Sequence, residues 1–275
     1  MGEPDATGDR RNAYVTATDA GIMLAASTVA GAINSIAGGG SLITFPLLVW
    51  LGRDPILANA TNTVSLSPGS VAALHGFRGE LDGLRDWIVR GTLPSLAGGV
   101  IGAVLLLQTP SRVFAWLVPY LILFATALFA LSGPINAVAR RRAGAGAHTL
   151  DGMPSRPPWV GIMVYQLGVS IYGGYFGAGI GIMMLAGLAL AGFTAIHRTI
   201  ALRNYYAILI NGVAALYFIV FGTIAWDDAI VLTVGQIAGG LVGARVARSL
   251  PATTVRWFVV TVGAAMAIGL LVRAA

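Results

Sequence analysis

The sequence predicts an all-α, polytopic membrane protein built from two inverted repeats. Of its 275 residues, 56% are apolar and only 10% are charged, whereas a soluble domain carries about 25% charged residues. The apolar runs are longer than a membrane strand requires and show no alternating pattern, which indicates helices and not a β-barrel. In addition, two glycine-rich patterns occur once in each half of the chain, which indicates an internal duplication.

The duplicated patterns define the domain boundaries. Ala97-Gly98-Gly99-Val100-Ile101-Gly102-Ala103 matches Ala238-Gly239-Gly240-Leu241-Val242-Gly243-Ala244, 141 positions later, with five identities in seven. Two glycine breaks, starting at Gly38 and Gly177, lie 139 positions apart. Pro, Gly and Arg are concentrated between the halves, as in a loop. We therefore expect a flexible N-terminal tail (1–18), a first transmembrane repeat (19–132), a cytoplasmic connecting loop (133–158) and a second transmembrane repeat (159–275).

Each half contains five apolar segments, which we interpret as helices. In the first half they cover about 20–37, 42–51, 55–77, 87–107 and 113–131. In the second half they cover about 159–176, 182–192, 195–221, 229–246 and 254–272.

The second segment of each half is too short to cross a membrane. About ten residues of helix span ~15 Å, which is half of a ~30 Å hydrocarbon core. Each short segment follows a glycine break, so we expect a broken or re-entrant half-helix that begins near the membrane midplane. Its first backbone N–H groups are unpaired and the positive end of its dipole lies there, so it can bind an anion.

The arginines favour inverted over parallel repeats. The chain has no lysine, so all 17 basic residues are arginine. With the connecting loop in the cytoplasm, inverted repeats place 12 arginines inside and 5 outside, whereas parallel repeats give 10 and 7. The positive-inside rule prefers the first arrangement.

Candidate site residues in the first half surround its glycine break and continue into the next segment. Small polar side chains are unusually dense there for a helix in lipid. They suggest a substrate path, although polar side chains in membrane helices also bond to neighbouring helices. The candidates are Asn34, Ser35, Gly38, Gly39, Gly40, Ser41, Asn59, Asn62 and Thr63.

The strongest candidate in the second half is Arg203. A charge inside a spanning segment is costly and usually functional, and a guanidinium offers a fork of donors to an oxyanion. The alternative is that Arg203 extends to the cytoplasmic surface. The further candidates are Tyr172, Gly177, Gly179 and Asn204.

Composition excludes several other functions. The chain has no cysteine for thiolate chemistry and no lysine for a Walker motif. No acidic residue lies deep in an apolar segment, which argues against a carboxylate proton relay or a cation path. No metal-ligand spacing or catalytic cluster is recognisable, so we expect no enzyme, no metal, no cofactor and no nucleic-acid partner. An anion channel, or a membrane-embedded enzyme or assembly factor, are the alternatives to a transporter.

The residues around the first break also resemble a known family. The stretch from Ala30 to Pro46, the Ala58-Asn59-Ala60-Thr61-Asn62-Thr63 element and the paired Ala-Gly-Gly segments are similar to the TauE/SafE sulfite exporters, also called toluene sulfonate uptake permeases. The second half departs from the first by having Ala178 and Ile180 in place of glycine and serine.

This resemblance implies a multi-pass protein of the bacterial inner membrane. Its substrate would be a small anion such as sulfite or an organosulfonate, for example sulfoacetate. We expect transport by alternating access at a midplane site. The expected partners are this anion and the lipid bilayer. A homodimer is a possible assembly.

Overall fold

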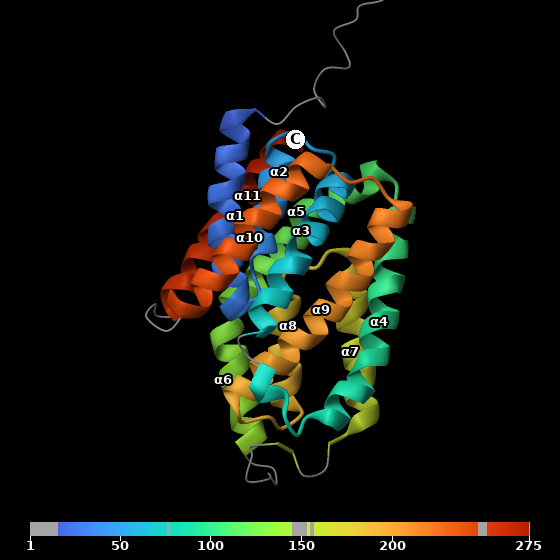
Figure 1. Ribbon diagram of the computed structural model, residues 1–275, viewed down its shortest axis with the longest axis vertical. Coiled ribbons are helices and arrows are strands. Elements are labelled where there is room, and N and C mark those ends of the chain that lie inside the picture. The colour runs from blue at the N-terminus through green and yellow to red at the C-terminus, as the bar shows by residue number, and fades with distance from the viewer. Residues whose placement is uncertain (1–15, 76–77, 145–152, 155–156, 247–251, 275) are drawn as a thin grey trace, which may run out of the picture.

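The protein is a bundle of long and short helices, as its computed structural model shows (Figure 1). The structure describes residues 16–75, 78–144, 153–154, 157–246 and 252–274. These residues contain eleven α-helices, one 3₁₀ turn and no strand. The all-α prediction is therefore confirmed for the part of the chain that is described.

The first half forms six α-helices and the 3₁₀ turn. The predicted segments agree with five of these helices to within a few residues at each end. The elements are α1 (Ala17–Ala37), α2 (Ser41–Trp50), α3 (Pro55–His75), η1 (Arg78–Leu81), α4 (Arg85–Gln108), α5 (Ser111–Ala130) and α6 (Ser132–Gly144).

The second half repeats the first five helices in the same order and with similar lengths. They are α7 (Trp159–Tyr175), α8 (Ile180–Leu190), α9 (Ile196–Phe221), α10 (Trp226–Val246) and α11 (Ala252–Ala274).

Two predicted boundaries differ from the structure. The N-terminal tail was expected to reach residue 18, but α1 begins at Ala17, because the Thr16 side chain accepts a hydrogen bond from the backbone N–H of Asp19 and caps the helix. The connection between the halves is not irregular throughout, since α6 occupies its first part. Residues 1–15, and most of the connection after α6, lie outside the described residues.

The outer surface of the bundle is apolar, as a protein surrounded by lipid requires. Helices α4, α5 and α9 are long and apolar enough to cross a membrane. Large apolar side chains on them face outward, including Leu93, Trp116 and Phe221, each at least 65% exposed. The shorter apolar helices are Ser41–Trp50, Ile180–Leu190 and the Arg256–Val272 part of α11.

Helices of the first half pack against helices of the second half. Helix α1 packs along α10 and α4 packs along α7, while α3 contacts α9 and α5 contacts α11. Exchanging each helix for its counterpart in the other half leaves this set of contacts unchanged. In Figure 1, α1 runs downward from the N-terminal end of the described chain and α7 runs upward from the connection between the halves.

Glycines allow these helices to pack closely. A Cβ on Gly102 of α4 would lie 2.2 Å from the carbonyl oxygen of Ile171 on α7. A Cβ on Gly239 of α10 would lie 1.9 Å from the carbonyl oxygen of Thr28 on α1. Small residues are typical of such contacts, since packing and not water exclusion holds membrane helices together.

Candidate functional site

The two glycine breaks meet in the interior of the bundle. Gly38 ends α1 with φ of +74°, and Gly179 precedes α8 with φ of +85°. A Cβ on Gly181 would lie 3.0 Å from the Cα of Gly38. The starts of the short helices α2 and α8, with 10 and 11 residues, therefore lie close together.

Gly38 lets the chain turn back immediately after α1. Its positive φ is the left-handed conformation that ends many helices, and its N–H bonds to the carbonyl oxygen of Asn34 at 3.2 Å. Gly40 permits the close return of the chain, because a Cβ there would lie 2.5 Å from the carbonyl oxygen of Ala30. Helix α2 then starts at Ser41.

Arg203 of α9 lies directly against both breaks. A Cβ on Gly38 would lie 1.9 Å from its Nη2, and a Cβ on Gly181 would lie 2.7 Å from the same atom. The side chain is only 2% exposed, so it does not extend to the surface as the alternative interpretation required. Its Nη2 donates a hydrogen bond to the carbonyl oxygen of Asn34 at 3.3 Å, and its Nη1 donates to Oδ1 of Asn204.

Among the residues that the structure describes, no carboxylate pairs with the positive charge of Arg203. The ion pair found among the described residues joins Arg53 and Asp228, at another place in the fold. Nε of Arg203 and Nδ2 of Asn204 are buried without a hydrogen-bond acceptor. A buried cation that lacks a counter-charge is costly, and so is a buried donor that lacks an acceptor. An anion bound at this place would remove both costs.

A small polar cavity lies at this meeting point. Its volume is about 20 Å³, which is enough for a water molecule. Its walls come from both breaks and from the two long helices that follow them, α3 and α9. The lining residues are Asn34, Gly38, Ser41, Leu66, Ser70, Gly177, Ile180, Gly181, Arg203, Asn204, Ala207 and Asn211.

The lining consists largely of positions that correspond between the halves. Leu66 and Ala207 are 141 positions apart, as are Ser70 and Asn211. Gly38 and Gly177, and likewise Ser41 and Ile180, are 139 positions apart. These are the spacings of the sequence repeat, so the cavity lies where the two halves face each other.

Six of the fourteen predicted site residues line this cavity. They are Asn34, Gly38, Ser41, Gly177, Arg203 and Asn204. The other eight do not line it. They are Ser35, Gly39, Gly40, Asn59, Asn62, Thr63, Tyr172 and Gly179.

Three of these eight residues form side-chain hydrogen bonds with other residues of the chain. Oδ1 of Asn62 accepts a hydrogen bond from the Thr44 hydroxyl at 2.5 Å, which joins α3 to α2. Nδ2 of Asn59 donates to the carbonyl oxygen of Tyr175 at 2.9 Å, across the two halves. The Tyr172 hydroxyl donates to the carbonyl oxygen of Ala178 at 2.8 Å and so holds the second break in place.

The cavity also contains residues that were not predicted for the site. Two of them are polar, Ser70 and Asn211, and a third, Gly181, packs closely against Arg203. A signal for Ser70 and Asn211 was present in the sequence, because both are polar and the repeat spacing relates them. Gly181 had only its place in the second break as a signal. Its closeness to Arg203 depends on how α8 packs against α9.

The donor groups define what the site can do chemically. The guanidinium of Arg203, the free amide of Asn204 and the starts of two half-helices all offer N–H donors or positive potential. No cluster of three His, Cys, Asp or Glu residues that could hold a metal occurs in the described residues. The arrangement suits a small oxyanion and offers no catalytic pair.

Comparisons with known proteins place the chain among membrane transporters. A family model described as "Sulfite exporter TauE/SafE" matches residues 23–270. The probable membrane transporter protein ORF9 of a Sinorhizobium species is 30% identical over 252 residues, which is 90% of this chain and 91% of the relative. The probable membrane transporter protein YfcA of Escherichia coli K12 is 29% identical over 257 residues, or 91% and 89%. A probable membrane transporter protein of Haemophilus influenzae is 30% identical over 246 residues, or 87% and 89%. No solved structure matches the chain.

Proposed function

The chain belongs to the TauE/SafE sulfite exporter family, and we propose that it carries a small sulfur oxyanion across the bacterial inner membrane. Family and relatives indicate a membrane transporter and not an enzyme. Sulfite and organosulfonates such as sulfoacetate are the proposed substrates. The observation that carries the proposal is the buried, unpaired charge of Arg203 between the two glycine breaks.

The proposed ligand is an SO₃-type head group. A guanidinium can donate two parallel hydrogen bonds to two oxygens of such a group. Nδ2 of Asn204, which has no acceptor in the described structure, can donate to the third oxygen, and the positive ends of the α2 and α8 dipoles attract the same charge. Ser41, Ser70 and Asn211 supply further polar contacts from the same cavity.

The small volume of the cavity implies movement. A space of about 20 Å³ holds a water but not an organosulfonate, so the ligand needs a conformation in which the halves separate. Inverted repeats provide two such conformations, one open to each side, and the opposite directions of α1 and α7 support this arrangement (Figure 1). The inside-negative potential favours outward movement of an anion by ~2.3 kcal/mol per charge per 100 mV.

The Arg53–Asp228 ion pair is the proposed latch on one side of the cavity. Nε and Nη2 of Arg53 donate to the carboxylate of Asp228 at 2.6 and 3.0 Å, which joins the loop after α2 to the start of α10 in the other half. These hydrogen bonds raise the pKa of Arg53 above its ordinary value. The Thr61 hydroxyl accepts a bond from the N–H of Ala225 at 3.1 Å and adds a second link. On the other side of the cavity, an aromatic contact joins the halves, with the ring centroids of Trp87 and Phe193 4.5 Å apart.

Breaking this latch should open the cavity to the side on which Arg53 lies. Because the chain has no cysteine, a single Ser41→Cys reporter in membrane vesicles reports access to a water-soluble maleimide. We expect Asp228→Asn to speed labelling several-fold from that side, since the change leaves the partly buried charge of Arg53 without its carboxylate. The matched control is Asp227→Asn, which removes the neighbouring acid but not the pair. Equal labelling rates in the two variants would argue against a latch.

The proposed substrate class is tested by anion binding and then by transport. The purified protein is heated with sulfite, sulfoacetate, taurine, thiosulfate or sulfate, with chloride at equal ionic strength as the control. We expect sulfite or an organosulfonate to raise the melting temperature beyond the chloride value, because only the bound anion pairs with Arg203. An equal shift with all the anions and chloride would contradict the proposal. Counterflow of the bound anion in proteoliposomes then separates a carrier from a channel.

A further inference from the structure

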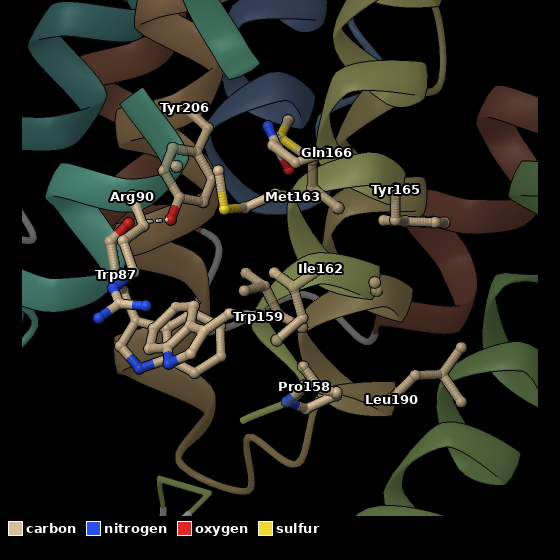
Figure 2. A pocket seen from close by; sticks show the side chains of 16 residues that line it. Trp87, Arg90, Pro158, Trp159, Ile162, Met163, Tyr165, Gln166, Leu190 and Tyr206 are labelled. Carbon is tan, nitrogen blue, oxygen red and sulfur yellow. Dashed lines mark hydrogen bonds between the residues drawn. The ribbon is translucent and has the colours of Figure 1, made fainter. Parts of the chain in front are cut away.

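A second, larger cavity lies between α4, α7 and α8, away from the central site. Its volume is about 210 Å³, and an apolar cavity of ~150 Å³ already holds a benzene molecule. Figure 2 shows its labelled side chains, with Arg90, Trp87 and Trp159 grouped together and Gln166 and Tyr206 at a distance from Trp159. The walls are mostly apolar, including Ile162, Met184 and Leu188.

Three polar side chains that line this cavity are hydrogen-bonded to the protein. Nε2 of Gln166 donates to the Ser95 hydroxyl at 3.0 Å, and the Tyr206 hydroxyl donates to the carbonyl oxygen of Trp87 at 2.6 Å. The Tyr165 hydroxyl donates to the carbonyl oxygen of Met183 at 2.7 Å. These three groups therefore need no bond from a ligand, and the rest of the lining is largely apolar.

The surroundings of the cavity face lipid. Val89 on α4 is 63% exposed, Val160 and Val164 on α7 are 79% and 66% exposed, and Leu190 on α8 is 52% exposed. These side chains lie on the same three helices that form the walls. In a membrane protein, such outward apolar side chains contact acyl chains, so lipid lies beside this cavity.

Arg90 adds a charge to the rim. Its guanidinium lies over the ring of Trp159, 4.5 Å from the centroid, and its side chain is exposed. Asp86 lies one helical turn earlier, yet no ion pair joins it to Arg90 in the described part of the chain. Arginine and tryptophan are typical of the depth at which lipid head groups lie. An anionic head group would supply the negative charge that Arg90 lacks.

We propose that this cavity binds one acyl chain of an anionic phospholipid, whose phosphate pairs with Arg90. The binding requires only that the protein lies in a membrane, so it is independent of the substrate carried at Arg203. The phosphate and the acyl chain each contribute, and each can be tested by its own variant.

The test compares two pairs of matched variants. Arg90→Gln removes the rim charge, and its control Arg85→Gln removes an exposed arginine of the same helix that does not line the cavity. Gly161→Leu adds a side chain to the cavity lining, and its control Gly168→Leu makes the same change on the same helix outside the lining. A Cβ on either glycine meets nothing within 4 Å, so both positions accept the first atom of a side chain. The melting temperatures of both variants without added lipid show whether each one folds.

Lipid retention is measured by native mass spectrometry in micelles with equal phosphatidylglycerol and phosphatidylethanolamine. We expect the wild type to retain phosphatidylglycerol preferentially, at least ~5-fold. Arg90→Gln should abolish the preference and Gly161→Leu should abolish retention of both lipids, while both controls behave as the wild type. Equal retention of the two lipids by the wild type, or unchanged retention in Gly161→Leu, overturns the proposal.

A last experiment tests whether the acyl chain is needed for binding, by using a soluble head group. Glycerol 3-phosphate carries the phosphate without an acyl chain. We expect phosphatidylglycerol, and not glycerol 3-phosphate, to raise the melting temperature of the wild type. If both raise it equally, the site binds free phosphate groups and the lipid proposal fails. These outcomes do not depend on sulfite binding, which can be measured on the same samples.

Discussion

Replacing Arg203 by Gln should weaken anion binding strongly and leave the empty protein folded. The guanidinium is buried without a carboxylate between the two glycine breaks. Truncating one partner of a buried hydrogen-bonded charge pair costs about 2–5 kcal/mol, so the dissociation constant should rise by ~30-fold or more. Isothermal titration with the anion that gives the largest thermal shift measures this change.

The melting temperature of the empty protein separates a binding role from a structural one. Arg203 places an uncompensated charge in the interior, and removing such a charge relieves a desolvation cost. We therefore expect Arg203→Gln without ligand to melt at or above the wild-type temperature. Arg112→Gln, which changes an exposed arginine at the start of α5, serves as the control for a general charge effect. Wild-type affinity in Arg203→Gln would remove this residue from the proposed site.

Adding one methyl group at either glycine break should also abolish binding. In Gly38→Ala the new Cβ would lie 1.9 Å from Nη2 of Arg203, and in Gly181→Ala it would lie 2.7 Å from that atom and 3.0 Å from the Cα of Gly38. Since the end of an arginine side chain can move, we expect the guanidinium to be displaced from the cavity. The anion then loses its main charged partner, and transport in proteoliposomes should fall at least ~10-fold.

A third glycine separates this effect from backbone strain. Gly38 has φ of +74° and Gly52 has φ of +87°, but a Cβ on Gly52 meets nothing within 4 Å. Both Gly38→Ala and Gly52→Ala therefore cost about 1–2 kcal/mol for a left-handed alanine, and both should lower the melting temperature. Gly181 has no positive φ, so Gly181→Ala tests the contact alone. Anion binding should be lost in Gly38→Ala and Gly181→Ala and kept in Gly52→Ala. Loss in both Gly38→Ala and Gly52→Ala, with binding kept in Gly181→Ala, would assign the effect to strain.

The helices were predictable because their signals are local. Long apolar runs separated by Gly, Pro and charged residues place α3, α4 and α9 within a few residues of their observed ends. The half-helices α2 and α8 follow from a glycine break and a run too short to cross the bilayer. Helix α6 was not predicted, because its sequence contains the three consecutive arginines 140–142 and has the polarity of a loop.

The candidate site was predictable only in outline. The sequence predicts the glycine breaks and Arg203 as site residues, because a charge or a glycine cluster is conspicuous in an apolar chain, and Gly38, Gly177 and Arg203 line one cavity. The roles of the neighbouring amides were not resolved. Asn59 and Asn62 have the same polarity as Asn204, yet they bond to Tyr175 and Thr44 while Asn204 faces the cavity. The group to which such a side chain bonds depends on residues elsewhere in the chain.

The sequence by itself determined that this protein lies in a membrane, that its helices occur in two matching sets, and that each set contains an interrupted helix. These properties depend on composition and on spacing along the chain, so they need no knowledge of contacts. Only the tertiary structure decided that Arg203 turns inward to Asn34, 169 positions earlier, and that Gly181 lies against Gly38. Both depend on how α8 and α9 pack across the interface between the halves, which no local pattern encodes.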